Sequence, residues 1–358
     1  MIYPHQIHCV VGGQYGSEAK GHVAAQLIKR LHDRQYTPVM NVRVGGSNAG
    51  HSAASYIDGK IIALRTIPIG ALVHPDINLV IAAGSEIDPE VLYHEIDLLE
   101  DHGIAVRHRL LIDRAATIIE PRHIEQETGS DLNSRTGSTS KGIGAARADR
   151  LMRKAAIARD WEFDPDYNIQ VVDTQTMLSL SSHAIVIEGT QGYGLGLHTD
   201  NYPQTTSGDC RAIDLCAQAG ITPTPKRPIH VWLVLRTYPI RVAGNSGNMN
   251  NELDWETLNQ RNQNITTEYT TVTKKVRRVA EWDSELARAA IIANGGLGDH
   301  MSLCLMFADY LDETMYQIDD FKMLDAPLIA KLAAIETELG QACDMYGTSP
   351  STVIWTNR

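Results

Sequence analysis

Apolar positions along the chain fall into short, uninterrupted runs separated by helix-like and polar segments. Runs of strand length occur at 7–11, 78–83, 183–189, 230–236, 302–308 and 351–355. Several of them lack alternation, which is typical of strands that are covered on both faces. Helix signals lie between them at 88–103, 284–296 and 325–340, with Asp88, Ser284 and Asp325 as expected N-caps. Strands that alternate with helices predict an α/β fold with a mostly parallel central sheet wrapped by helices.

The domain organisation predicted from this pattern is a single domain over residues 1–358. The chain shows no internal repeat, low-complexity tract or linker. The strand signal lapses over about 107–180, and this range is the expected insertion. Polar, glycine-rich loops follow the apolar runs, so we expect ligands to bind at the carboxyl ends of the strands.

Composition narrows the function classes. Hydrophobic content of 43% and charged content of 21% are typical of a globular protein. The net charge is −11, and the longest basic run is KKVRR at 274–278, which argues against binding of polymer nucleic acid. No run approaches the ~20 apolar residues of a membrane span, and no secretory signal is visible. Five scattered cysteines without CxxC spacing indicate reduced thiols rather than structural zinc, and Cys9 and Cys304 lie in apolar runs, where buried thiols are expected. We therefore expect a cytoplasmic protein without a membrane partner.

Five glycine- and hydroxyl-rich loops carry the candidate chemistry. The first, VVGGQYGSEAKGH at 10–22, joins an apolar run to a helix start and has a lysine that can neutralise a phosphate, but it is not a Walker motif. The others are RVGGSNAGHS at 43–52, GSTSKGIGAA at 137–146, the loop at 188–208 and TTVTKKVRRV at 270–279. Each alone also fits a structural interpretation, such as a plain turn or a solvated basic stretch. Together they favour phosphate and carboxylate ligands.

In this order, the loops resemble the adenylosuccinate synthetase family, from near the N-terminus to about residue 312. Family members carry GDEGKGK, GGxNAGHT, GTTGRGIGP, EGAQG…YPFVTSS and TTGRxRR at the matching places, and the C-terminal part matches weakly. The resemblance implies an α/β ligase that joins aspartate to C6 of a purine nucleotide in two steps. A nucleoside triphosphate phosphorylates O6, aspartate displaces the phosphate, and Mg²⁺ offsets charge.

The resemblance also implies roles for individual residues. Ser17, Lys20 and His51 are the expected catalytic residues, and Ser17 and the Gly50 carbonyl the expected magnesium ligands. The expected binding residues are Gly16, Ser17, Glu18, Ala19, Lys20, Gly21, Gly50, His51, Ser52, Phe307 and Asp309 for the donor nucleotide; Ser17, Asn48, Ser138, Thr139, Arg153, Gln191 and Thr206 for the purine monophosphate; and Thr271, Val272, Thr273, Lys275 and Arg277 for aspartate. A homodimer is expected, in which Arg153 reaches the phosphate across the interface.

Departures from the family pattern point to an altered purine. Ser17 stands where the family has a carboxylate that contacts N1 of IMP. A shorter hydroxyl leaves room beside C2 for the amino group of guanine. The pattern resembles phage-type synthetases that convert dGMP to N6-succino-2-amino-2′-deoxyadenylate for 2-aminoadenine DNA, in the cytoplasm of a host cell. Lys275 in place of an arginine near the ribose fits a deoxyribose. Phe307 in place of a lysine, beside Asp309, favours ATP or dATP as the donor.

Two alternatives stay open at the level of sequence. One is an ordinary adenylosuccinate synthetase that uses IMP and GTP. The other is a non-catalytic, nucleotide-binding regulator, because replacement of a catalytic carboxylate usually abolishes the chemistry that needs it. Retention of Asn48, His51, Gln191 and Thr206 together argues against the regulator.

Overall fold

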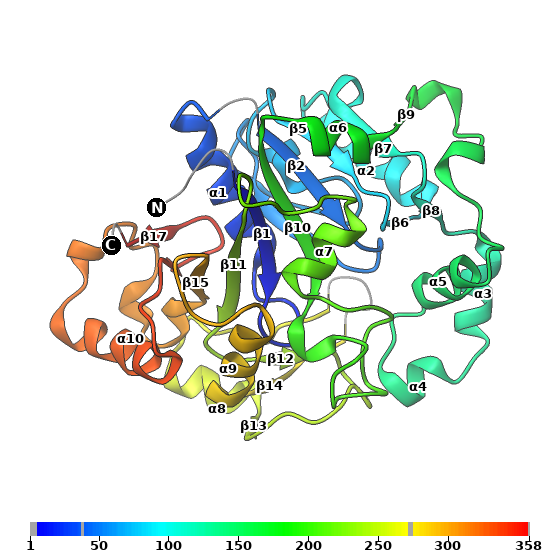
Figure 1. The fold of residues 1–358 in the computed structure, drawn as a ribbon. Helices are drawn as coiled ribbons and strands as arrows, with labels where there is room; N and C mark the ends of the chain where they lie inside the picture. Colours follow the sequence, from blue (N-terminus) through cyan, green and yellow to red (C-terminus); the bar gives the residue numbers. More distant parts are fainter. Residues whose placement is uncertain (1–5, 37–38, 271–274, 357–358) are drawn as a thin grey trace.

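The computed structural model describes residues 6–36, 39–270 and 275–356, and a ten-stranded sheet forms its centre (Figure 1). The strands of this sheet are β1 (Ile7–Gly12), β2 (Val39–Val44), β5 (Asn78–Ile81), β7 (Leu110–Asp113), β9 (Gln170–Val172), β10 (Ala184–Gly192), β11 (Ile229–Arg236), β15 (Met301–Met306), β16 (Met345–Gly347) and β17 (Val353–Trp355). Their order is β17-β16-β15-β11-β1-β10-β2-β5-β7-β9. All neighbours pair in parallel except β16 and β17. The predicted fold class is confirmed.

The central strand β1 is buried on both faces. Side chains alternate between two apolar cores, so that Val10 packs with Leu27 and Ile28 of one helix on one face. Cys9 and Val11 lie in the second core, on the other face. Each of the six apolar runs found in the sequence contains a strand. Burial on both faces is the reason that these strands show no alternation.

Helices cover both faces of the sheet (Figure 1). They are α1 (Lys20–Asp33), α2 (Pro89–Asp101), α3 (Pro121–Thr128), α4 (Leu132–Thr136), α5 (Ile143–Leu151), α6 (Thr174–Leu180), α7 (Ala212–Gln218), α8 (Trp255–Arg261), α9 (Ser284–Ala293) and α10 (Ala326–Leu339). Helices α1 and α2 contribute to the first core, and α7, α9 and α10 contribute to the second.

The three predicted helix starts are confirmed in position, and one predicted cap is wrong. Asp88 accepts a hydrogen bond from the Glu90 amide at 3.2 Å, and Asp325 accepts one from the Leu328 amide at 3.0 Å. Helix α9 is capped by Asp283, which accepts from the Leu286 amide at 2.9 Å, and Ser284 is its first residue. A carboxylate one residue earlier reaches the same free amides and takes the place expected for the serine.

The range 107–180, predicted as an insertion, contains both sheet strands and peripheral helices. Strands β7 and β9 form one edge of the sheet, although they are too short to stand out in the sequence. Helices α3, α4 and α5 lie to one side of the sheet (Figure 1). The bounds of an insertion, and a single domain, stay predictions.

Three small sheets hold loops around the carboxyl ends of the central strands. They are the pair β3 (His51–Ala54) and β4 (Ile61–Leu64), the pair β6 (Glu86–Ile87) and β8 (Thr117–Ile118), and a three-stranded sheet of β12 (Ile240–Arg241), β14 (Arg278–Ala280) and β13 (Glu252–Leu253). Among the described residues, no helix is long and apolar enough to cross a membrane. All five cysteines are free and buried, and burial was predicted for Cys9 and Cys304.

Candidate active site

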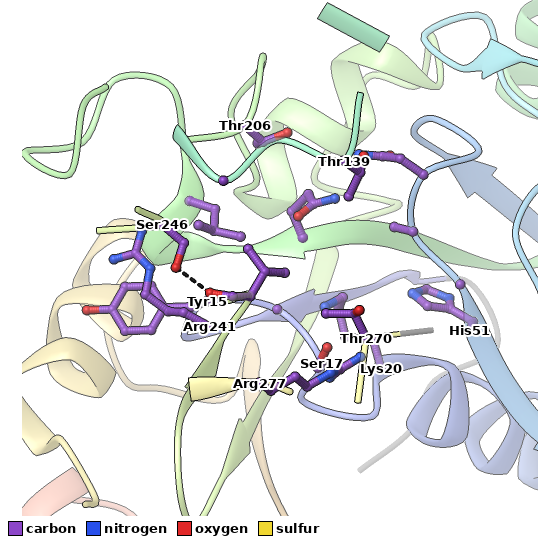
Figure 2. A pocket seen from close by; sticks show the side chains of 18 of the residues that line it. Tyr15, Ser17, Lys20, His51, Thr139, Thr206, Arg241, Ser246, Thr270 and Arg277 are labelled. Carbon is purple, nitrogen blue, oxygen red and sulfur yellow. Dashed lines mark hydrogen bonds between the residues drawn. The ribbon is translucent and has the colours of Figure 1, made fainter. Parts of the chain in front are cut away.

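A cavity of about 700 Å³ lies where β1, β10, β11 and β15 end (Figure 2). The loops that follow these strands converge on it, together with residues from 48–52 and 135–144 and with Glu268, Thr270 and Arg277. Sixteen of the predicted site residues line it: Gly16, Ser17, Ala19, Lys20, Gly21, Asn48, Gly50, His51, Ser52, Ser138, Thr139, Gln191, Thr206, Arg277, Phe307 and Asp309. The topology therefore brings together residues that are far apart in the sequence.

Glu18 holds the backbone of the first loop, at 10–22, by hydrogen bonds and does not line the cavity. Its buried carboxylate accepts hydrogen bonds from the Gln14 amide at 3.1 Å and the Gly16 amide at 2.7 Å, and Lys20 Nζ lies 2.7 Å away. A Cβ at Gly12 would stand 2.5 Å from this carboxylate, so only glycine fits there. Because both oxygens are engaged, Glu18 supports the loop and is not free to act as a base.

The N-terminus of α1 opens onto the cavity without a side-chain cap. Its N-cap, Ala19, is in the left-handed region at φ 69° and makes no side-chain hydrogen bond to the first-turn amides. Gly21 packs against His51, where a Cβ would meet the His51 Cβ at 2.5 Å. Free amides at a helix N-terminus, beside the Lys20 ammonium group, form an anion site suited to phosphate oxygens.

Ser17 is exposed to the cavity and adopts φ 59°. Its carbonyl accepts a hydrogen bond from Arg236 Nη1 at 3.1 Å, and Arg236 Nη2 lies 2.6 Å from the Glu268 carboxylate. Burial would raise the pKa of Glu268, but the Arg236 charge outweighs it and lowers that pKa. The ion pair thus holds the backbone at Ser17 and leaves its hydroxyl free to face a ligand.

His51 is held by a buried ionic network. Its Nδ1 lies 2.5 Å from Glu188 Oε2 and also contacts the Arg43 guanidinium. Arg43 Nη1 is 3.3 Å from the same carboxylate oxygen. Glu188 is therefore the acceptor that fixes the Nδ1–H tautomer. Among the described residues, none bonds His51 Nε2.

Burial sets the charge of this histidine. Burial and the positive charge of Arg43 lower the pKa of His51 to about 4. Burial alone would raise the pKa of Glu188, but Arg43 and His51 lower it, so the carboxylate stays ionised. At neutral pH, His51 is a neutral imidazole beside a carboxylate, and negative charge arriving near Nε2 favours its protonation.

Phe307 and Asp309 line the cavity beyond the end of β15. The Arg236 guanidinium carbon lies 4.0 Å from the centre of the Phe307 ring, and the Tyr310 ring meets the same side chain edge-on, with the ring centres 5.2 Å apart. Asp309 is 6% exposed, and burial raises the pKa of its carboxyl group to about 7. This group therefore changes protonation near neutral pH.

Three predicted site residues lie off the cavity wall, and three cannot be placed. Besides Glu18, Arg153 and Lys275 do not line the cavity, and both are exposed. Arg153 follows α5 at φ 60°, next to the exposed Leu151 and Met152. Thr271, Val272 and Thr273 fall outside the described residues.

Sequence reasoning missed several residues around the cavity. Tyr15, Arg241, Val242, Ser246 and Glu268 line it. Arg241 and Val242 lie in the segment RTYPIRVAG at 236–244, for which the sequence predicted no site residue. Tyr15 lies in the first glycine-rich loop, whereas Ser246 and Glu268 belong to no quoted motif and are found only from their placement in the structure.

Comparison with known proteins agrees with the motif order. The sequence model of adenylosuccinate synthetase matches residues 9–166 and 161–342. The chain is 35% identical over 344 residues to adenylosuccinate synthetase from Pyrococcus sp. (strain ST700), covering 95% of each chain. It is 33% identical over 343 residues to that of Archaeoglobus fulgidus, again covering 95% of each.

Two solved structures have the same fold. Fully ligated adenylosuccinate synthetase from Plasmodium falciparum superposes with a TM-score of 0.81 at 19% identity, covering 98% of this chain and 100% of that one. Cyanophage S-2L succinoaminodeoxyadenylate synthetase, bound to dGMP and to dATP as an energy donor, gives 0.79 at 27% identity, covering 99% and 97%.

Proposed function

The chain belongs to the adenylosuccinate synthetase family of C–N ligases, which join aspartate to a purine nucleotide, and within it we propose dGMP as the purine substrate. The observation that carries this proposal is Ser17, a hydroxyl that faces the cavity where the family pattern has a carboxylate. The Glu18 carboxylate is occupied by the Gly16 amide and by Lys20, and the Glu268 carboxylate is paired with Arg236. Neither replaces the missing group, so space remains beside Ser17 for a 2-amino group.

In the proposed reaction, O6 of dGMP takes the γ-phosphoryl group of the donor, which leaves as a nucleoside diphosphate. The amine of L-aspartate then attacks C6, and inorganic phosphate departs with O6, giving N6-succino-2-amino-2′-deoxyadenylate. Thr139 and Thr206 supply hydroxyls for the 5′-phosphate, and Arg277 supplies a cation for aspartate. His51 Nε2, its ring fixed by Glu188, bonds the oxygens on which charge builds.

The family reaction depends on Mg²⁺, and the first loop offers few ligands of its own. Magnesium prefers carboxylate and phosphate oxygens. Here the Ser17 hydroxyl and the Gly50 carbonyl, both at the cavity, would hold the ion together with oxygens of the donor phosphates. The ion would neutralise phosphate charge there, and Lys20 with the α1 N-terminus holds the remaining oxygens.

A second candidate is the ordinary reaction with IMP and GTP. It is favoured by the relatives at 33–35% identity, all named adenylosuccinate synthetase. Steady-state assays with dGMP and IMP in parallel separate the two. We expect kcat/KM to be at least ~10-fold higher for dGMP. Preference for IMP would contradict the proposal, as would a crystal of the dGMP complex with the purine ring away from Ser17.

For the donor we propose ATP or dATP, with a preference that depends on pH. A protonated Asp309 carboxyl can donate to N1 of adenine and accept from its N6 amine, whereas the ionised form suits the two donors of guanine. Because the pKa of Asp309 is raised to about 7, the adenine-binding form is lost as pH rises through 7.

The ratio of kcat/KM for ATP to that for GTP is therefore expected to fall roughly tenfold between pH 6 and pH 8. Groups that act on both donors, including His51, cancel in this ratio. Asp309→Asn is the matched control, because its amide does not titrate and should give a flat ratio. A ratio equally flat in the unaltered protein would rule out this use of Asp309.

We also propose a homodimer in which Arg153 reaches the partner's nucleotide phosphate. Leu151 and Met152, beside Arg153, are 75% and 62% exposed, as expected of a surface that a second copy covers. A monomer in sedimentation experiments at assay concentrations would contradict this arrangement.

A further inference from the structure

Two histidines and an aspartate gather outside the cavity wall, where the end of α1 meets the segment that precedes β5. His32 lies in the last turn of α1, and His74 and Asp76 lie between the 3₁₀ helix η1 (Ile69–Leu72) and β5. One possible ligand atom from each side chain lies within 4.8 Å of the other two. In the part of the chain that the structure describes, this is the one such group of His, Cys, Asp or Glu side chains.

The two imidazole rings lie against each other. Their centres are 3.9 Å apart, and their planes differ by 33°. His74 Nδ1 lies 3.6 Å from Asp76 Oδ2 and accepts a hydrogen bond from the Asp76 amide at 3.2 Å. His32 Nδ1 lies 3.8 Å from a second carboxylate oxygen, Oδ1 of Asp33. Both rings are partly exposed, so an ion can reach these nitrogen and oxygen atoms from solvent.

The backbone that carries these side chains is held in place. The buried Arg109 guanidinium donates to the carbonyls of Ala71 at 3.2 Å, His74 at 2.9 Å and Ile77 at 2.9 Å. His32 is held by α1, which packs on the first core. Ligands that are already in place lose little freedom when an ion binds. The C-terminal end of a helix also carries a partial negative charge, which favours a cation beside His32.

We propose that His32, His74 and Asp76 bind a divalent transition-metal ion such as Zn²⁺. Imidazole nitrogens and a carboxylate oxygen are ligands of this class, whereas Mg²⁺ prefers oxygen ligands. Zinc–nitrogen bonds of about 2.0 Å place two tetrahedral ligand atoms ~3.3 Å apart, so the three atoms need to approach one another by ~1.5 Å at most.

The ion would join the end of α1 to the segment before β5. His74 Nδ1 exchanges the Asp76 amide for the ion, and water takes the freed amide. Water also completes the coordination of the ion. Because neither histidine lines the cavity, the ion is structural and separate from the Mg²⁺ of the ligase reaction.

Calorimetry with Zn²⁺ tests this site in the untagged full chain, with excess Mg²⁺ present to fill the cavity. We expect one Zn²⁺ per chain at the strongest site, bound at least ~10-fold more weakly by His32→Ala, His74→Ala and Asp76→Ala. The melting temperature of the unaltered protein should rise with Zn²⁺ concentration, and the three variants should lose this rise. His94→Ala, which removes an exposed histidine of α2 outside the group, is the matched control and should bind Zn²⁺ as the unaltered protein does.

The proposal is overturned if the unaltered protein binds no Zn²⁺, or if the three variants bind it as tightly as the control. Anomalous X-ray scattering at the zinc edge locates the ion in the unaltered protein, so this measurement does not depend on a variant folding. A peak between His32 and His74 supports the assignment, and peaks only at other places overturn it.

Discussion

Ser17→Asp is expected to lower kcat/KM for dGMP by about 10²-fold or more and to raise it for IMP. The longer side chain takes the space that the 2-amino group of guanine needs, and its carboxylate can accept the N1 proton of hypoxanthine. The backbone tolerates the change, because position 17 is at φ 59°, where aspartate is among the better-accepted residues. Parallel assays with the two monophosphates measure the inversion.

Ser17→Asn is the matched control for this switch. It has the length of aspartate without its charge, so it should exclude dGMP and give no gain with IMP. Ser17→Ala keeps the space but removes the hydroxyl, and it should keep the preference for dGMP at a lower kcat. If Ser17→Asp leaves the order of the two substrates unchanged, the purine is not selected at this position.

His51→Ala is expected to reduce kcat by ~10²-fold or more while the purine monophosphate still binds. The imidazole lies in the cavity wall with Nδ1 fixed by Glu188, so its removal deletes the group aimed at the reacting oxygens. Phosphate release under saturating substrates measures turnover, and calorimetry with the monophosphate measures binding.

His94→Ala serves as the control for this loss, because His94 is exposed on α2 and outside the cavity wall. Full turnover in a folded His51→Ala variant would show that another group stabilises the transferring phosphoryl group. Loss of monophosphate binding together with turnover would instead mean that the residue supports the shape of the site.

The sequence determined six strands of the ten-stranded central sheet, the starts of helices α2, α9 and α10, and most of the residue types around the cavity. Unbroken apolar runs favour parallel strands that are buried on both faces. In a parallel sheet, the loops that follow the strands lie together at the edge formed by the carboxyl ends of the strands. The replacement of a carboxylate by Ser17 is a fact of the sequence, and the substrate proposal depends on it. The short strands β7, β9 and β16 were not predicted, because four or fewer residues carry little periodicity. Strand β2 was not predicted either, because Asn41 and Arg43 interrupt its apolar run.

Only the tertiary structure decided which of these residues are free to act. In the structure, the Glu18 carboxylate accepts a hydrogen bond from the backbone of its own loop, and His51 pairs with a carboxylate 137 residues away. The Ser246 hydroxyl donates to the Val242 carbonyl. The tertiary structure also buries Asp309 enough to bring its pKa near 7. The local sequence gives the spacing of apolar residues, which predicts helices and strands, and it gives the chemical type of each side chain. Burial, partners and charge state depend on neighbours from other strands, and those neighbours meet only when the sheet has formed.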